Sequence, residues 1–439
     1  MSEQRKSIRS CRRRKSLGVV LALCAAFLPA SPAAGNWPQW RGPDLNGVSG
    51  ERNLPLRWGA EENVAWKLPL PGASASTPVV WGDRVFLNVP EGEEIYLWCV
   101  DKKRGALVWK KPLRGGAAAL RVHPKHNPST PSPATDGRGV YVLNGYGSLR
   151  SFDFSGREAW ARDLQKDYGR FGLNFGYASS PLLYEDSLYV QVLRATRAND
   201  PSYILRIDKR TGKTLWKMDF PADAIKAAES YSTPTILRYG KAAELVVNGS
   251  DQVTGHDLAT GRELWRVAGL SSVPENPPPR VVSSPVAADG VVYAPASFRP
   301  LVALRAGGRG DIAGSHQLWS SRNGPDIPSP VTDGKYFYVV NDKGIARCLD
   351  AKTGREVWGP ERLKPGNYSS SPVLADGRVY VVSEEGVTTV LRAGPKFEVL
   401  AENSLDDSCL SSPAVSGGQI LIRTARHLYC IGARAGARR

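Results

Sequence analysis

Residues 371–382 read Ser-Pro-Val-Leu-Ala-Asp-Gly-Arg-Val-Tyr-Val-Val, and this stretch decides the fold. Two apolar runs on either side of an Asp-Gly pair predict two strands joined by a tight turn. The same Ser/Thr-Pro step, with an apolar pair and a turn after it, occurs eight times at intervals of 41 to 55 residues. Its prolines are Pro78, Pro133, Pro181, Pro234, Pro285, Pro330, Pro372 and Pro413. Each interval is long enough for four short strands and their turns.

The second half of the unit is clearest in residues 348–358, Cys-Leu-Asp-Ala-Lys-Thr-Gly-Arg-Glu-Val-Trp. Here a strand ends in an Asp-x-x-Thr-Gly turn, in which Asp can accept turn amides and Gly can adopt positive φ. Gly and Trp keep a separation of four residues in five units. The pairs are Gly105 and Trp109, Gly156 and Trp160, Gly212 and Trp216, Gly261 and Trp265, and Gly354 and Trp358.

A large aromatic side chain at one place on the outer strand can fill the wedge between neighbouring units. This structural role is expected for Trp66, Trp109, Trp160, Trp216, Trp265, Trp319 and Trp358. Units five and seven are degenerate, because Arg305 and Arg392 stand where the turn Asp would be, and Phe397 begins the strand that replaces the Trp strand of unit seven.

The fold class predicted is all-β, an eight-bladed β-propeller of four-stranded antiparallel blades. The eighth unit ends before its Trp strand. Residues 64–68, Val-Ala-Trp-Lys-Leu, supply the missing strand from upstream of the first Ser/Thr-Pro step. Pairing them with residues 428–431 would complete the last blade and remove the open sheet edges.

The N-terminus has the pattern of a secretory signal peptide, with Arg12, Arg13, Arg14 and Lys15 before an apolar run over 17–28 and small residues up to Gly35. We expect a signal peptide over 1–35, an extension over 36–62, the propeller over 63–432 and a basic tail over 433–439. No transmembrane segment is expected. The signal peptide predicts export to the periplasm or outer envelope. Residues 21–24, Leu-Ala-Leu-Cys, offer lipidation as an alternative, although Leu23 stands where a small residue is normal, and the arginines also loosely resemble a twin-arginine signal.

The net charge is +16, and it falls to +10 once the first 35 residues are removed. The remaining charge is spread through turns, which is typical of a solvated surface, so no nucleic-acid partner is expected; attraction to an anionic partner is the alternative. Cys99, Cys348, Cys409 and Cys430 form no CxxC or CxxCH motif, which excludes attached c-type haem and the common zinc spacings. A Cys409–Cys430 disulfide stays open. The closely spaced His123 and His126 are a poor ligand set, and no metal site is predicted.

The Ser-Pro hairpin, the Asp-x-x-Thr-Gly turn and the Trp together resemble the repeat of the pyrroloquinoline-quinone (PQQ) type of propeller over residues 63–432. Residues 36–43, Asn-Trp-Pro-Gln-Trp-Arg-Gly-Pro, resemble the opening of many exported bacterial members of this group. The resemblance implies a fold shared by quinoprotein dehydrogenases, BamB-type scaffolds of outer-membrane assembly and other exported proteins, so it does not assign a function.

The resemblance also allows the enzyme alternative to be examined. Quinoprotein dehydrogenases of this kind hold PQQ between a tryptophan floor and a ring of two adjacent cysteines, beside calcium and a catalytic Asp. This chain has no adjacent cysteine pair, and none of Trp37, Trp40, Trp58, Trp81 and Trp98 stands on a segment that leads into a Ser/Thr-Pro step. No cofactor is therefore expected, with PQQ and calcium as the alternative.

A partner would contact the segments that join one Trp strand to the next Ser/Thr-Pro strand, because they share one face of the ring. Residues 167–177 are the richest in aromatic, arginine and glycine residues, a composition typical of binding surfaces. The candidates are Arg121, His123, Tyr168, Arg170, Phe171, Asn174, Phe175, Tyr177, Glu229, Tyr231, Asn323, Asn367, Tyr368, Asp406 and the neighbouring Asp407. A competing interpretation is that Phe171 and Phe175 only plug the channel mouth.

The sequence thus favours an exported, non-catalytic propeller that binds a protein or glycan partner in the bacterial envelope, with a monomer expected. The alternative is an enzyme that uses the channel mouth, either a PQQ-dependent quinoprotein or a carbohydrate-active protein.

Overall fold

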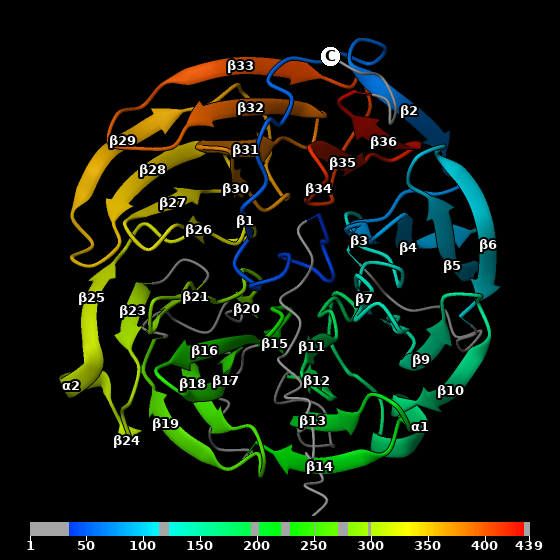
Figure 1. Cartoon of the computed structure of the whole chain (residues 1–439). Helices are drawn as coiled ribbons and strands as arrows, with labels where there is room; N and C mark the ends of the chain where they lie inside the picture. The colour runs from blue at the N-terminus through cyan, green and yellow to red at the C-terminus, as the bar shows by residue number, and fades with distance from the viewer. Residues whose placement is uncertain are drawn as a thin grey trace, which may run out of the picture. The chain divides into compact units, whose positions relative to one another are not determined.

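The computed structural model describes residues 35–113, 123–194, 202–220, 229–249, 251–270, 280–296 and 300–433. The chain separates into Met1–Ala33 and Ala34–Arg439, and the described residues all lie in the second unit. Eight antiparallel sheets, one for each repeat, are arranged in a ring in this unit (Figure 1). The predicted eight-bladed β-propeller is therefore confirmed.

The first four blades follow one another along the chain, each with its inner strand first. Blade 1 contains β3 (Val79–Trp81), β4 (Arg84–Glu91), β5 (Glu94–Asp101) and β6 (Ala106–Pro112). Blade 2 contains β7 (Ala134–Thr135), β8 (Gly139–Leu143), β9 (Ser148–Asp153) and β10 (Glu158–Asp163). Blade 3 contains β11 (Leu182–Tyr184), β12 (Ser187–Val192), β13 (Tyr203–Asp208) and β14 (Thr214–Asp219). Blade 4 contains β16 (Thr235–Tyr239), β17 (Ala242–Gly249), β18 (Gln252–Asp257) and β19 (Glu263–Val267).

The other four blades complete the ring. Blade 5 contains β21 (Val286–Ala288), β22 (Val291–Ala294), β23 (Leu301–Arg305) and β25 (Gln317–Ser321). Blade 6 contains β26 (Val331–Thr332), β27 (Tyr336–Val340), β28 (Ile345–Asp350) and β29 (Glu356–Arg362). Blade 7 contains β30 (Val373–Ala375), β31 (Arg378–Val382), β32 (Val387–Arg392) and β33 (Val399–Ser404). Blade 8 contains β34 (Ala414–Ser416), β35 (Gln419–Arg423), β36 (His427–Ile431) and β2 (Val64–Pro69).

Six short elements lie outside this pattern. They are the strands β1 (Val48–Ser49), β15 (Glu229–Ser230), β20 (Arg280–Val281) and β24 (Gly310–Asp311) and the helices α1 (Leu164–Tyr168) and α2 (Ala313–His316). β15 and β20 pair in parallel between the loops that lead into blades 4 and 5, and β24 adds a parallel edge to β19.

The ring closes as the sequence predicts. β2 pairs antiparallel with β36, with Trp66 opposite Cys430 and Leu68 opposite Leu428. The N-terminal strand therefore supplies the outer strand of the last blade, so the two ends of the repeat region hold one sheet together.

The residue before the proline of each Ser/Thr-Pro step forms a closed belt of hydrogen bonds around the ring. Its backbone N–H donates to the side-chain hydroxyl of the equivalent residue in the next blade. The links run Thr77 to Ser132 (2.9 Å), Ser132 to Ser180 (2.9 Å), Ser180 to Thr233 (3.0 Å), Thr233 to Ser284 (2.8 Å), Ser284 to Ser329 (2.9 Å), Ser329 to Ser371 (2.9 Å), Ser371 to Ser412 (3.0 Å) and Ser412 back to Thr77 (3.2 Å). All eight residues are buried. The step is thus repeated because a buried N–H in every blade needs an acceptor.

Six of the seven repeat tryptophans lie against the turn of the following blade, where the indole N–H donates to a turn carbonyl. The acceptors of Trp66, Trp109, Trp160, Trp216, Trp319 and Trp358 are Lys102, Phe154, Lys209, Leu258, Ala351 and Gly394, at 2.7 to 3.1 Å. Gly105 shows why the turn requires glycine, since it has φ 66° and a Cβ there would come within 2.4 Å of the Trp66 ring.

Trp265 differs from the other six. Its indole donates to Glu244 of its own blade at 2.7 Å, and Arg309 from the following blade forms an ion pair with the same carboxylate. In the fifth unit β24 and α2 lie between β23 and β25, in the place of the short Asp-x-x-Thr-Gly turn. Trp265 still packs between blades 4 and 5, in one apolar cluster with Val292 and Leu304.

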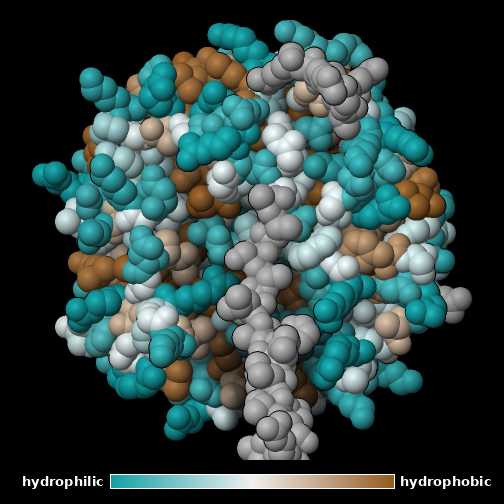
Figure 2. Space-filling model, in the orientation of Figure 1, coloured by the Kyte–Doolittle hydropathy of each residue, from teal (hydrophilic) through white to brown (hydrophobic). Residues whose placement is uncertain are grey.

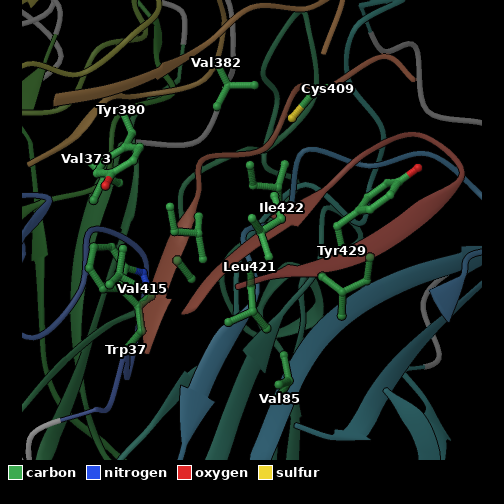
Figure 3. Close-up of a cluster of buried hydrophobic side chains, with 14 of the residues drawn as sticks. Trp37, Val85, Val373, Tyr380, Val382, Cys409, Val415, Leu421, Ile422 and Tyr429 are labelled. Atoms are coloured by element: carbon green, nitrogen blue, oxygen red, sulfur yellow. The ribbon is translucent and has the colours of Figure 1, made fainter. Parts of the chain in front are cut away.

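The N-terminal extension crosses the middle of the ring on one face, where β1 lies (Figure 1). Trp37 exchanges two backbone hydrogen bonds with Val80, and β1 pairs in parallel with β30. Figure 3 shows Trp37 beside side chains of blades 7, 8 and 1, with which it forms one apolar cluster. Arg41 is fully buried and donates to the carbonyls of Pro330 and Pro372, and desolvation lowers its pKa to about 9. The extension is therefore part of the folded core.

Candidate binding surface

The loops that join an outer strand to the next inner strand emerge on the face of the ring opposite the turns that carry the repeat glycines. We call this the loop face. Residues from three of these loops meet there in a group that we call the aromatic cluster: His123, Asn174, Phe175, Glu229 and Tyr231. The sequence analysis singled out all five, but only their position in the repeat grouped them.

Helix α1 and the residue before it fix the loop that carries Phe175. Asp163 accepts the N–H groups of Gln165 and Lys166 at 3.1 Å, which caps the helix at its N-terminus. Gln165 in turn accepts the N–H of Phe171 at 2.9 Å and donates to the carbonyl of Tyr146 at 2.8 Å. The loop is thus held at both ends by side-chain amide and carboxylate groups.

Phe175 is the exposed centre of the aromatic cluster, with 40% of its surface accessible. Its ring centroid lies 5.6 Å from that of His123 and 6.1 Å from that of Tyr231. Its N–H donates to the Tyr231 hydroxyl at 3.2 Å, and its carbonyl accepts the N–H of His123 at 3.3 Å. Hydrogen bonds on both sides of the residue hold its backbone in place, and the exposed ring lies between those of His123 and Tyr231.

The buried carboxylate of Glu229 forms hydrogen bonds with two other members of the aromatic cluster. Both Glu229 oxygens accept the N–H of Asn174 at 3.0 Å, and the Tyr231 hydroxyl donates to the same carboxylate. Burial raises the pKa of Glu229, and these hydrogen bonds partly oppose that effect. Burial and the neighbouring carboxylate also raise the pKa of Tyr231, so the phenol stays protonated and remains a donor.

Three predicted contact residues are buried instead. Phe171 and Tyr177 stack within the core at 4.4 Å, and the Tyr177 hydroxyl donates to the Gln191 carbonyl at 3.0 Å. Tyr368 is completely buried, and its hydroxyl donates to the Lys364 carbonyl at 2.8 Å. These aromatics belong to the packing under the loop face; Phe171 and Tyr177 share one apolar cluster with Leu164 and Leu188. They are not available to a partner at this surface.

The remaining candidates are spread around the rim. Tyr168 is half-buried beside Tyr203. Exposed side chains are those of Arg170, Asn323 and Asp406. Asn367 accepts a hydrogen bond from Lys343 at 3.1 Å, and Arg121 lies outside the described residues. Asp407 is buried and forms an ion pair with Arg426 at 3.1 Å, and its pKa is lowered because hydrogen bonds from Thr424 and Arg426 outweigh its desolvation. Asn367 is linked to the aromatic cluster indirectly: its carbonyl accepts the Glu384 N–H at 2.8 Å, and Lys125, which pairs with Glu384, donates its N–H to His123 Nδ1 at 3.2 Å.

Sequence reasoning missed an ion pair that links distant parts of the loop face. Lys125, between blades 1 and 2, pairs with Glu384 of blade 7 at 2.8 Å, although 259 residues separate them. Ser369 donates to the same carboxylate at 2.5 Å. Neither Lys125 nor Glu384 occupies a repeated position, so no pattern in the sequence could have revealed the pair.

The described residues offer no donor set suited to PQQ with calcium or to another metal. They contain no cluster of three or more His, Cys, Asp or Glu side chains placed to hold a metal ion. Four loop-face carboxylates already have protein partners: Glu229 with Tyr231, Asp326 with Arg280, Glu384 with Lys125 and Asp407 with Arg426. Cys99, Cys348, Cys409 and Cys430 are each free and buried, so the alternative of a Cys409–Cys430 disulfide is not realised.

Comparisons with known structures support the fold. BamB from Moraxella catarrhalis aligns over 84% of this chain and 99% of its own, with a TM-score of 0.59 and 13% identity. Quinohemoprotein alcohol dehydrogenase from Comamonas testosteroni aligns over 93% of this chain and 82% of its own, with a TM-score of 0.68 and 12% identity. At such identities the likeness shows the fold alone. The fold and repeat define a propeller of the PQQ-like class.

Sequence comparison identifies the family. A family model described as "Outer membrane protein assembly factor BamB" matches residues 58–190, 99–359 and 310–439, and the chain belongs to this family. BamB of Burkholderia pseudomallei is 33% identical over 112 residues, which cover 25% of this chain and 28% of that protein. BamB of Nitrosomonas eutropha is 22% identical over 263 residues, or 57% of this chain and 55% of that protein. The matches thus span between about a quarter and just over half of these relatives.

Among the described residues, no helix has the length and apolar character needed to cross a bilayer.

Proposed function

We propose that this protein is an exported, non-catalytic scaffold of the bacterial envelope that binds a protein partner through the aromatic cluster. The observation that carries the proposal is Phe175, an exposed aromatic side chain held by hydrogen bonds from two other loops. An ordered aromatic surrounded by polar groups is typical of the residues that dominate binding energy at protein interfaces, because little conformational entropy is lost on binding. The names of the relatives, outer membrane protein assembly factors, support a role in that process.

Complementation tests this function. A bacterial strain that lacks its own BamB is supplied with this chain or with its Phe175→Ala variant, and folded outer-membrane proteins are measured by heat-modifiable gel mobility. We expect the chain to restore their level and the variant to restore less, at equal amounts of protein in the envelope. Leu107→Ala changes an exposed apolar side chain at the start of β6, beside a repeat-glycine turn and so on the opposite face, and is the control. No restoration by the unaltered chain would contradict the assembly role.

The enzyme alternative has its own test. Purified protein is mixed with PQQ and calcium, scanned for quinone absorbance after gel filtration, and assayed for dye-linked alcohol and sugar oxidation. We expect no retained quinone and no dye reduction, because the chain lacks the adjacent cysteines of the quinoprotein resemblance and the described residues contain no cluster of side chains placed to hold a metal ion. Retained quinone with dye reduction would establish the quinoprotein function instead.

A further inference from the structure

A cavity of about 290 Å³ lies on the opposite face of the ring, beside the N-terminal extension. Val48 and Asp44 of the extension form one side, and the inner parts of blades 4, 5 and 6 form the other. In Figure 1 the labels β1, β16, β21 and β26 surround this region, and Figure 2 shows that the surrounding surface is mostly hydrophilic. Nothing in the proposed function uses this cavity.

The inner strands of other blades show which groups bind the backbone of an inner strand on this face. A two-residue turn joins each of these inner strands to the next strand of its blade. The residue just before the last paired residue of the inner strand directs its N–H and C=O away from the partner strand. Val80, Leu183 and Leu374 occupy this place in blades 1, 3 and 7. Val80 bonds to the backbone of Trp37, Leu183 to the side-chain amide of Gln39 at 2.9 and 3.1 Å, and the Leu374 N–H to the Gly47 carbonyl at 2.9 Å. The extension therefore satisfies outward backbone groups of the inner strands on three blades.

Blades 4 and 5 are different. Their last hairpin pairs are Tyr239 with Ala242 and Ala288 with Val291, which gives Arg238 and Ala287 the same outward-facing place. Both residues line the cavity. No group among the described residues forms a hydrogen bond with the outward backbone of either one. The cavity thus exposes backbone donors and acceptors of the kind that the extension satisfies in blades 1, 3 and 7.

The charge of the cavity adds a second constraint. Asp44, Asp289 and Asp333 line it, against the single cation Arg238, which lies 3.7 Å from Asp44 and over the Tyr184 ring. Asp289 has φ 48° in the hairpin turn and forms no ion pair or hydrogen bond with any described residue. It lies close to the turn of blade 6, since a Cβ on Gly334 would come within 2.1 Å of its carboxylate. The excess negative charge favours a cationic group there.

The size of the cavity limits the ligand. Sites for small molecules range from roughly 300 to 1,000 Å³, so this cavity suits a long side chain with a short length of backbone better than a cofactor. We propose that it binds an extended peptide segment of another protein. The segment adds to the free inner edges of β16 and β21, as the extension does elsewhere, and places a lysine or arginine side chain beside Asp289 and Asp333.

Isothermal titration of the full chain with the peptide acetyl-Thr-Val-Lys-Val-Thr-amide tests the proposal. We expect binding by the unaltered protein and no binding of the same peptide with Glu in place of Lys. Asp289→Asn keeps the shape and tolerates positive φ, and it should weaken binding by about tenfold or more. Ala287→Pro removes the outward N–H at a sheet edge, where proline is tolerated, and should weaken it as well. Glu185→Gln removes a carboxylate at the same turn position of blade 3 and should leave binding unchanged.

The titrations can either support the proposed peptide site or overturn it. Equal binding of the Lys and Glu peptides, no binding by the unaltered chain, or full affinity in Asp289→Asn would overturn the proposal. Melting temperatures show whether Ala287→Pro has unfolded, in which case Asp289→Asn alone decides. Phe175→Ala should bind the peptide normally, so the result is independent of the function proposed for the loop face.

Discussion

The Ser/Thr belt repeats one hydrogen bond in all eight blades, whereas the aromatic cluster draws on three loops that share no sequence pattern. The belt residues are buried and satisfy one another around a closed circle. The cluster residues satisfy one another too, but they leave Phe175 at the surface. This difference shows how the propeller separates its tasks: the repeated positions stabilise the ring, and the positions that break the repeat create a surface with its own specificity.

Opening the ring at blade 8 should have the largest effect on the repeated part. Deletion of residues up to Lys67 removes most of β2, the Trp66 contact with blade 1 and the buried extension, and leaves β36 with an unpaired edge. We expect aggregation or a strongly lowered melting temperature, measured by light scattering and calorimetry. Deletion of residues 1–35 is the control and should melt as the full chain does. An equally stable, monomeric deletion to Lys67 would contradict this account of closure.

Breaking one link of the belt should have a smaller effect. Ser284→Ala leaves the Thr233 N–H without its acceptor, and an unsatisfied buried donor costs about 1–3 kcal/mol. Urea denaturation should show this loss of unfolding free energy. Ser284→Thr keeps the hydroxyl, and Thr already occupies the position in two other blades, so it should stay close to the unaltered protein. A loss of equal size in both variants would assign the effect to packing and not to the hydrogen bond.

Lowering the pH should test how a buried histidine affects the stability of blade 4. His256 is completely buried, and desolvation lowers its pKa from 6.5 to about 4. The unfolded chain therefore binds a proton that the folded chain does not, and the stability contribution of this residue is lost as pH falls from 6.5 towards 4. We expect thermal unfolding to show this decline, and His256→Gln to reduce its slope. An unchanged slope in the variant would show that other groups cause the decline.

The smallest effect on stability is expected at the loop face itself. Phe175→Ala should change the free energy of unfolding by no more than about 0.5 kcal/mol, because surface substitutions seldom exceed this. Phe171→Ala, four residues earlier in the same loop, should cost about 3 kcal/mol because its ring is buried against Tyr177. Denaturation of both variants gives the comparison. Similar losses in the two would mean that Phe175 is a core residue and not a binding residue.

The candidate site could be predicted only in part. Asn174 and Phe175 were singled out from the composition of their loop, and His123, Glu229 and Tyr231 from their position in the repeat. The same reasoning also selected Phe171, Tyr177 and Tyr368. An aromatic residue in a loop can point outward to a partner or inward to the core, and its neighbours along the chain do not decide between these. The ion pair of Lys125 and Glu384 left no trace in the sequence, because its two residues occupy unrelated positions in unrelated blades.

The sequence by itself determined the number of blades, the hairpin turns and the closure by residues 64–68, because local turn chemistry and strand alternation recur in every unit and can be read from neighbouring residues. Only the tertiary structure decided how the Ser/Thr hydroxyls link the blades, how Arg41 becomes buried between Pro330 and Pro372, and why Ala287 faces a cavity while Leu183 is covered. These contacts join residues that lie from about forty to more than three hundred positions apart. The belt residues recur with the repeat, but their hydrogen bonds, like the contacts of Arg41, exist only because the closed ring brings the inner strands and the extension together.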